Sequence, residues 1–310
     1  MSDPVPTPGL LECCSAAVGT VRGAVRPRPA DERLLRSLTD AGLPTARRIV
    51  TVTPLAQVSR SVPTMAVVEG RFAPRRIANS LSSFVIRHPE ATFVVDPGYC
   101  VDADRRAIAQ LPRILRMAVR PPSDTIPTIT ALRAESSLPA LDFALPTHAH
   151  WDHVCGLLDL PGLPLHLHSV EHRWIATGAV APVGGVRDAL TDRRLVEYDL
   201  DGPPVLTFGR SHDLFGDGSV VLVDLAGHTP GSIGILAHTG SGWVLLAGDA
   251  AWHSLQIDEL RQKSSFPGNF ADDDRALTFE TLHRLHLARH TVTIVPTHDY
   301  DATRRLAARV

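Results

Sequence analysis

The chain has little of what marks a disulfide-rich, membrane-spanning or exported protein. Its four cysteines (Cys13, Cys14, Cys100 and Cys155) have neither the spacing of a disulfide framework nor that of a Cys-x-x-Cys zinc knuckle. No apolar run approaches the length of a transmembrane helix, and the first residues lack the basic start and apolar stretch of a signal peptide. These absences lead us to expect a cytoplasmic protein with free thiols.

An excess of charge of one sign is also lacking. The 31 lysine and arginine residues nearly balance the 33 aspartate and glutamate residues, which gives a formal net charge of −2. Lysine itself is almost absent, because Lys263 is the only one. A chain without a strong electrostatic footprint is not expected to bind nucleic acid or an anionic membrane. The expected partner is a small-molecule substrate, and a homodimer is compatible with the sequence.

The composition that remains is that of an ordinary globular protein. Hydrophobic residues make up 44% and charged residues 21% of the 310 positions. A chain of this length can bury a large core without disulfides. We predict a Pro- and Arg-rich extension over residues 1–47, with one short helix at 31–39, followed by a single domain over residues 48–310.

Short β-rich segments and helical patterns alternate along the predicted domain. The predicted strands cover residues 64–69, 83–87, 92–95, 142–146, 163–168, 219–224, 234–237, 243–246 and 291–295. The predicted helices cover residues 103–117, 126–135, 170–175 and 273–289, while 178–218 and 252–270 are expected to be irregular. This alternation predicts an α/β fold in which two sheets pack face to face with helices outside.

The strongest chemical signal is the segment His148-Ala-His-Trp-Asp-His153. His148 and His150 alternate with Ala149, so in an extended stretch their side chains point the same way. Asp152 and His153 follow where the chain turns toward a helix, and they face another direction. Two ligand pairs with different directions suit two metal ions better than one. Imidazole and carboxylate ligands are typical of zinc, and also of iron, manganese or cobalt.

Three later segments repeat one pattern, in which a strand ends and a ligand-type residue follows on a tight turn. These residues are His228 in Gly-His-Thr-Pro-Gly, Asp249 in Gly-Asp, and His298 in Pro-Thr-His. Ligands that follow strand ends are expected to meet at one edge of the fold, where rigid elements present a catalytic site.

Taken together, these motifs resemble those of the metallo-β-lactamase-fold hydrolases, over roughly residues 60–300. The resemblance implies an αββα four-layer sandwich of two mixed sheets with helices on the outer faces. It implies two divalent metal ions, with zinc expected, and a bridging hydroxide as the nucleophile. His148, His150 and His228 would hold the first metal. Asp152, His153 and His298 would hold the second metal, and Asp249 would bridge the two.

The same resemblance narrows the reaction. Asp249 stands where the true β-lactamases carry Cys or Ser, and only twelve residues follow His298, which leaves little room for the helical region of the glyoxalase II-like thioesterases. The remaining match is to the lactonase, esterase and phosphotriesterase-like branch, with Asp152 and Asp249 as catalytic residues. We expect hydrolysis of small esters or lactones. The alternatives are a mononuclear iron sulfur dioxygenase of the same fold, or a phosphotriesterase or thioesterase.

The wall of the substrate pocket is expected in the residues after the bridging aspartate. Trp252 stands where acyl-homoserine lactonases place a tyrosine, and His253 or Tyr300 are candidates to replace its function. Phe266 and Phe270 are apolar rings that would line a cleft beside the metals. The alternative is that both rings anchor the loop to the core.

Three other groups of polar residues are given ordinary roles. His166 and His168 are expected on the outward face of a strand. His283, His286 and His290 are expected as a solvated stripe on a helix, and the carboxylates of residues 272–274 as a helix start.

Overall fold

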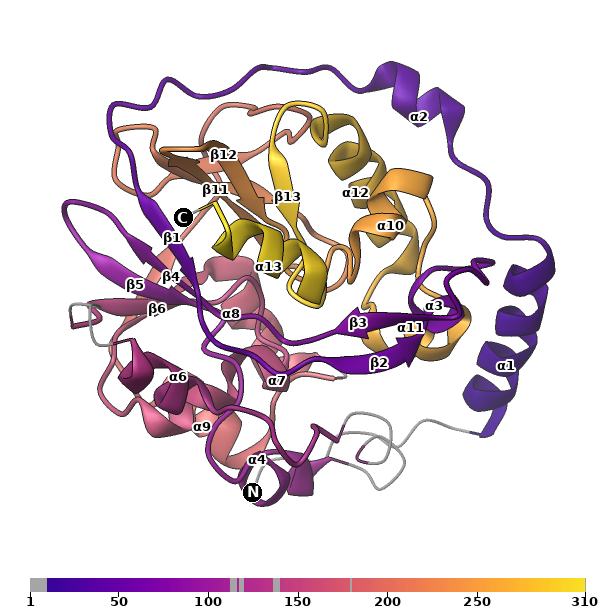
Figure 1. Ribbon diagram of the computed structural model, residues 1–310, viewed down its shortest axis with the longest axis horizontal. Helices are drawn as coiled ribbons and strands as arrows, with labels where there is room; N and C mark the ends of the chain where they lie inside the picture. Colours follow the sequence, from indigo (N-terminus) through magenta and orange to yellow (C-terminus); the bar gives the residue numbers. More distant parts are fainter. Residues whose placement is uncertain (1–9, 112–115, 117–119, 136–139, 179, 310) are drawn as a thin grey trace.

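Two mixed β-sheets form the centre of the structure, a computed structural model that describes residues 10–111, 116, 120–135, 140–178 and 180–309 (Figure 1). The first sheet has the strand order β1 (Thr51–Pro54), β4 (Phe84–Arg87), β5 (Thr92–Val95), β6 (Phe143–Leu145), β7 (Leu165–His168) and β8 (Leu195–Tyr198). The second sheet has the order β13 (Thr293–Val295), β12 (Gly242–Leu246), β11 (Ile233–Thr239), β10 (Val220–Asp224) and β9 (Ser211–Asp213). A separate ribbon pairs β2 (Arg60–Pro63) with β3 (Arg76–Asn79).

Helices cover the outer face of each sheet. The first sheet is covered by α4 (Ala103–Arg106), α7 (Trp151–Val154), the 3-10 helix η2 (Cys155–Asp159), α8 (Ser169–Thr177) and α9 (Gly184–Thr191). The second sheet is covered by α10 (Ser254–Glu259) and α12 (Arg275–Ala288). On the outer face of the first sheet, α6 (Thr128–Ala134) packs against β4. The other described helices are α1 (Leu10–Val25), α2 (Glu32–Ser37), α3 (Thr64–Val67), η1 (Ile108–Gln110), α11 (Ser265–Ala271) and α13 (Tyr300–Ala307). The predicted αββα sandwich is therefore confirmed.

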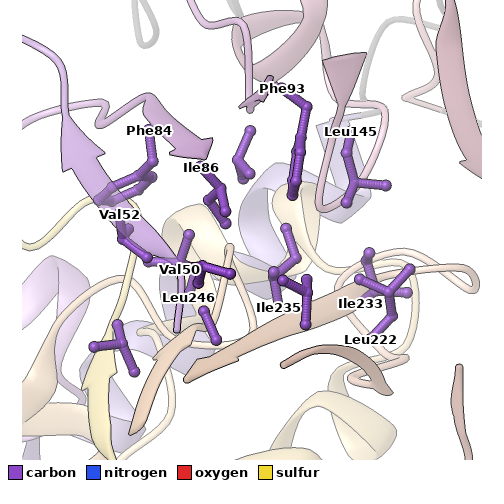
Figure 2. Packing of buried hydrophobic residues seen from close by; sticks show 14 of the residues in the cluster. Val50, Val52, Phe84, Ile86, Phe93, Leu145, Leu222, Ile233, Ile235 and Leu246 are labelled. Carbon is purple, nitrogen blue, oxygen red and sulfur yellow. The ribbon is translucent and has the colours of Figure 1, made fainter. Parts of the chain in front are cut away.

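The main core lies between the two sheets (Figure 2). Phe84 and Ile86 of β4 point into it, whereas Val85 packs on the other face of the same strand against α6. Successive side chains of a strand point to opposite faces, so a strand that is buried on both faces needs a continuous apolar run. This is why β4, β5 and β10 have almost unbroken runs of Phe, Val, Ile and Leu, and why these strands were predicted correctly.

Parallel strand pairs bring the ends of distant segments to the same edge. β5 pairs with β6, and β12 pairs with β13, each in parallel. In the second pair Leu246 is opposite Val295, so the residues that follow both strands emerge side by side. The candidate site lies at this edge, which is the arrangement expected from the strand-end motifs.

Several predicted elements are wrong, each for a local reason. Residues 64–67 form the short helix α3 rather than a strand, although the segment is apolar, because a run this short does not distinguish the two structures. The irregular stretch 178–218 contains α9, β8 and β9, and the stretch 252–270 contains α10 and α11. The helix predicted over 103–117 is broken into α4 and η1, and most of its remainder lies outside the described residues.

The N-terminal extension has one helix more than predicted. The predicted helix is α2, and the side chain of Asp31 caps it by accepting from the backbone N–H groups of Arg33 and Leu34. The additional helix, α1, packs on α11 through small residues, and a Cβ added at Gly19 would lie 2.5 Å from Ser265 Oγ. Between α1 and β1 the chain runs along the outside of the molecule (Figure 1). Across the described residues, no helix is long and apolar enough to cross a bilayer.

Candidate metal centre

All seven predicted ligand residues gather at one sheet edge. His148 and His150 follow β6, and Asp152 and His153 lie on α7 directly after them. The remaining three residues follow or connect strands of the second sheet: His228 between β10 and β11, Asp249 after β12 and His298 after β13. The structure brings these side chains together into three overlapping groups, in each of which the candidate ligand atoms lie within 4.8 Å of one another.

The first group consists of three imidazoles. His150 Nδ1 lies 2.9 Å from His148 Nε2 and 2.9 Å from His228 Nε2. Three ring nitrogens that converge in this way cannot all be satisfied by the protons they carry, since each neutral ring has one donor and one acceptor. In a tetrahedral zinc site with Zn–N bonds of about 2.0–2.1 Å, neighbouring ligand atoms lie about 3.3 Å apart. The cluster therefore fits a metal ion at its centre.

The second and third groups share His153 and place Asp249 between the two halves of the site. Asp249 Oδ1 lies 3.3 Å from His153 Nε2, while Oδ2 lies 3.4 Å from His228 Nε2 and 3.2 Å from His298 Nε2. Within the described part of the chain, His153 Nε2 and Asp249 Oδ1 are buried and make no hydrogen bond. Buried polar atoms are rarely left without a partner, so these atoms fit metal ligands as well.

Neighbouring groups fix the orientation of the histidines from behind. His153 Nδ1 lies 2.9 Å from Asp96 Oδ2, and His228 Nδ1 lies 2.8 Å from Asp272 Oδ1. His298 Nδ1 donates to the backbone carbonyl of Ser80 at 2.7 Å. With the Nδ1 position occupied, Nε2 of each ring is left to face the centre, as in most protein metal sites.

The electrostatics of the cluster favour neutral imidazoles at His148 and His150 and positive charge beside the carboxylate of Asp249. Burial and the neighbouring histidines lower the pKa of His148 and of His150 well below the usual range. For Asp249, burial opposes ionisation, but His298 and His153 hold its pKa well below the usual value. For His153, burial would lower the pKa, yet Asp249 and Asp96 raise it well above the usual value. The carboxylates thus attract positive charge to the site, which a metal cation would supply.

Glu171 joins two of the ligand loops. This buried carboxylate accepts from the backbone N–H of Ala149 at 2.7 Å, from Thr229 Oγ1 at 2.7 Å and from the backbone N–H of Gly231 at 3.0 Å. Burial raises the pKa of Glu171 to about 7, although these three donors oppose the shift. A lone glutamate on a predicted helix gives no sequence signal of this role.

A cavity of about 240 Å³ opens directly onto the candidate centre. Asp152, Asp249 and His298 form part of its floor, and Trp252, Phe266 and Phe270 form part of its wall. The remaining lining includes Val58, Leu81, Leu111, Pro122 and Val180, so most of the surface that faces a ligand is apolar. Clefts that bind small organic molecules commonly have this character.

Among the residues that the structure describes, the cavity lining does not include His253 or Tyr300. His253 caps α10, where its Nδ1 accepts from the backbone N–H of Leu255, and Tyr300 begins α13 with Arg304 over its ring. The expectation that either residue replaces the missing tyrosine is therefore not supported by their positions. Tyr99 and Arg60 do line the cavity and were not predicted. Only the position of Tyr99 in the turn after β5 could have indicated it.

Trp252 contacts the predicted bridging residue directly. Its indole N–H donates to Asp249 Oδ2 at 2.7 Å, and its ring lies edge-on to that of His298, with 5.6 Å between the centroids. An indole nitrogen can donate a hydrogen bond but cannot act as an acid. The position of Trp252 therefore suits it to orient the carboxylate.

Three ordinary roles given to polar residues need correction. Asp274 does cap α12, but Asp272 is buried and bonds His228, because the helix begins later than the first of these carboxylates. Burial opposes ionisation of Asp272, yet Lys263 and His228 lower its pKa. His168 is buried and bonds the carbonyl of Gly231, while His283 is buried and accepts from the backbone N–H of Asp31. Both histidines face packed neighbours that a local pattern does not reveal.

Known proteins share both the sequence pattern and the fold. Probable metallo-hydrolases of Mycobacterium bovis and Mycobacterium tuberculosis are each 34% identical over an alignment of 175 residues, and the match covers 50% of this chain and 54% of those proteins. The chain therefore spans about half the length of the curated relatives it matches.

Two solved structures have the same fold. An N-acyl homoserine lactone hydrolase with the product N-hexanoyl-L-homoserine bound at its catalytic metal centre superimposes with a TM-score of 0.59 at 16% identity, over 84% of this chain and 96% of that chain. AidC, a dizinc quorum-quenching lactonase, gives 0.54 at 15% identity, over 84% and 92%. The family model described as the metallo-beta-lactamase superfamily matches residues 78–298, which contain every predicted ligand. The chain belongs to the metallo-beta-lactamase superfamily.

Proposed function

We propose that this protein is a dinuclear metal-dependent hydrolase of small carboxylic esters or lactones. The observation that carries the proposal is the position of Asp249, whose two oxygens lie between His153 on one side and His228 and His298 on the other, at the floor of an apolar cavity. Five of the seven ligand residues line this cavity, so a nucleophile and a substrate could reach the metals, which catalysis needs and a closed structural site lacks. Support also comes from the lactone hydrolases that share the fold.

Two divalent metals at these ligands would supply a hydroxide near neutral pH and polarise the oxygen that becomes negative. The protein residues orient the reactants around them. Asp152 is half-buried and lines the cavity, so its carboxylate is placed to take a proton from the nucleophile and to return it to the leaving group. Trp252 and His298 hold Asp249 from one side, and the apolar wall excludes water from the acyl part of the substrate.

Tyr99 lines the cavity and brings a phenol to it. The acyl-homoserine lactonases place their tyrosine elsewhere, at the position that Trp252 occupies in this chain. Burial and the nearby Asp152 raise its pKa above the usual value, so the phenol stays protonated and can donate a hydrogen bond. In the proposed reaction Tyr99 donates to the oxygen that gains charge, which is the contribution otherwise expected of the lactonase tyrosine.

The test combines metal analysis with a screen of substrates on the same preparation. Aryl esters, lactones, thioesters and phosphotriesters are supplied to protein loaded with zinc, manganese, cobalt or iron. We expect the highest kcat/KM on an ester or lactone, and a loss of roughly tenfold or more in kcat/KM for Tyr99→Phe on that substrate. One iron per chain together with oxygen consumption on a persulfide would instead identify a sulfur dioxygenase.

A further inference from the structure

The only lysine of the chain is buried behind the candidate metal centre. Lys263 is 2% exposed, although the other 30 basic residues are arginines. Its Nζ donates to Asp272 Oδ1 at 2.7 Å and to the backbone carbonyl of Asp249 at 2.9 Å, and it lies 5.0 Å from the centroid of the Trp252 ring. A buried ammonium group is tolerated only when it is paired and hydrogen-bonded, and all three contacts meet this need.

The same carboxylate oxygen connects Lys263 to a predicted metal ligand. Asp272 Oδ1 accepts from Lys263 and also lies 2.8 Å from His228 Nδ1. The cation therefore touches the backbone of one ligand, Asp249, and the orienting partner of another, His228. The backbone N–H of Asp273 additionally donates to the carbonyl of His228 at 3.0 Å, which fixes this part of the chain to the His228 turn.

Lys263 and Asp272 also flank the helix that forms part of the cavity wall. Helix α11 (Ser265–Ala271) lies between them in the sequence and carries Phe266 and Phe270, which line the cavity. The ion pair thus joins the two ends of α11 at its base, next to the ligands. A change in the position of His228 or Asp249 would be transmitted to the ends of this helix, and the reverse also holds, because linkage between two sites is reciprocal.

We propose that the Lys263–Asp272 pair is a positioning unit that couples the metal ligands to the α11 wall, so that metal binding and selection of the acyl group depend on each other. The acyl part of this statement rests on the proposed hydrolase function, whereas the coupling to metal does not. An ion pair that only stabilises the fold would affect the melting temperature and leave both properties unchanged.

The single lysine allows a direct measurement on the unmodified protein. When lysine labelled with ¹³C and ¹⁵N is incorporated, the side-chain NMR signals report on Lys263 alone. We expect the Lys263 Cε and Nζ resonances to shift between metal-free and zinc-loaded protein, because the carboxylate and the carbonyl that they contact move or change polarisation with the ligands. Identical resonances in the two states would overturn the proposal.

Variants then separate coupling from general stability. Lys263→Met leaves Asp272 without its cation, so the double variant Lys263→Met/Asp272→Asn is used to restore neutrality. The matched control is Arg284→Met, because Arg284 is a partly buried cation that likewise donates to a backbone carbonyl, that of Thr207 at 2.7 Å, and it does not line the cavity. Zinc affinity is measured by competition with a chromophoric chelator, which needs no turnover.

We expect both Lys263 variants to bind zinc about ten- to a hundredfold more weakly. The ratio of kcat/KM for para-nitrophenyl octanoate to that for para-nitrophenyl acetate should also change by at least about threefold. The double variant should recover the melting temperature but not this ratio, and Arg284→Met should change neither property. A folded double variant with wild-type zinc affinity and wild-type chain preference would overturn the proposal. Zinc coupling without turnover of any ester or lactone would instead contradict the proposed function alone.

Discussion

Four of the five histidines in the candidate centre use one ring nitrogen for the protein and leave the other for the site. His148, His153, His228 and His298 place Nδ1 on Thr147, Asp96, Asp272 and the Ser80 carbonyl, respectively. His150 differs, because its Nδ1 faces the other imidazoles and its buried Nε2 has no hydrogen-bond partner within the described residues. The orientation of His150 therefore depends on packing, including the Trp174 ring at 5.4 Å, rather than on a hydrogen bond.

The proposed bridging role of Asp249 predicts a specific loss of function. Asp249→Ala should lower kcat/KM by at least about two orders of magnitude, because both halves of the site lose a ligand. Asp224→Ala is a suitable control, since Asp224 also ends a strand of the second sheet but pairs with Arg210 at the surface. Steady-state kinetics on the best substrate, with thermal melting as the folding check, measure the difference. Activity of Asp249→Ala within a few-fold of wild type would place the active site elsewhere.

Glu171 predicts a pH dependence of stability. Its folded-state pKa of about 7 lies above the value of 4.5 for the free side chain, so the folded protein holds this proton more tightly than the unfolded chain. The contribution is therefore present at low pH and is lost as the pH rises toward 7. Relative to Glu171→Gln, the melting temperature of metal-free wild type should fall between about pH 5 and about pH 7.5. A wild-type advantage that grows with pH over this interval would contradict the assignment.

The sequence reveals the ligands of the site but not the residues that orient them. His148, His150 and His228 stand in short motifs whose residue types and spacing indicate metal ligands. Asp96 and Glu171 are single carboxylates in an apolar strand end and a helix, and their partners are far away in the sequence. Whether such a residue is solvated or buried depends on tertiary packing, which no local pattern contains.

At the level of elements, the strands buried on both faces were predictable and the short helices were not. The apolar runs of β4, β5 and β10 are required by burial on both faces, so their sequences identify them. Helices α10 and α11 have six and seven residues, which is too short for a periodic pattern. Their ends are fixed by contacts with distant residues, such as the bond from Phe266 N to Thr20 Oγ1 at 2.9 Å.

The aromatic rings of α11 predict substrate selectivity. Phe266 is 49% exposed and lies edge-on to Phe270, with 5.8 Å between the centroids, so Phe266 faces the cavity rather than the core. Phe266→Ala and Phe270→Ala should raise KM for long-chain esters more than for short-chain esters, with unchanged metal content. Phe72→Ala is the control, because Phe72 is 58% exposed and does not line the cavity. Lowered thermal stability with unchanged kinetics would assign these rings to the core.

For the whole molecule, the centre joins segments from both sheets, so metal binding should stabilise the fold. We expect about two transition metals per chain when the protein is prepared without chelator. Removing them should lower the melting temperature by about 5–10 °C if the free metal concentration is near a hundred times Kd. Calorimetry with and without chelator, and again after zinc is restored, measures the effect. Well-folded protein that never binds more than one metal would contradict a dinuclear centre.

The paired strands β12 and β13 also determine where this chain can change in length. Leu246 is opposite Val295, and Asp249 and His298 each come three residues later. The two residues between each strand end and its ligand, 247–248 and 296–297, form a spacer. One residue inserted in either spacer would move the ligand along the chain by about 3.3 Å, which is more than the tolerance of a metal–ligand bond. The stretch from Gly178 to Gly218 contains no predicted ligand, and its turns have no such requirement. In a library of single-residue insertions, the two spacers should therefore be the positions where folded variants lose metal, while the turns between Gly178 and Gly218 accept additional residues.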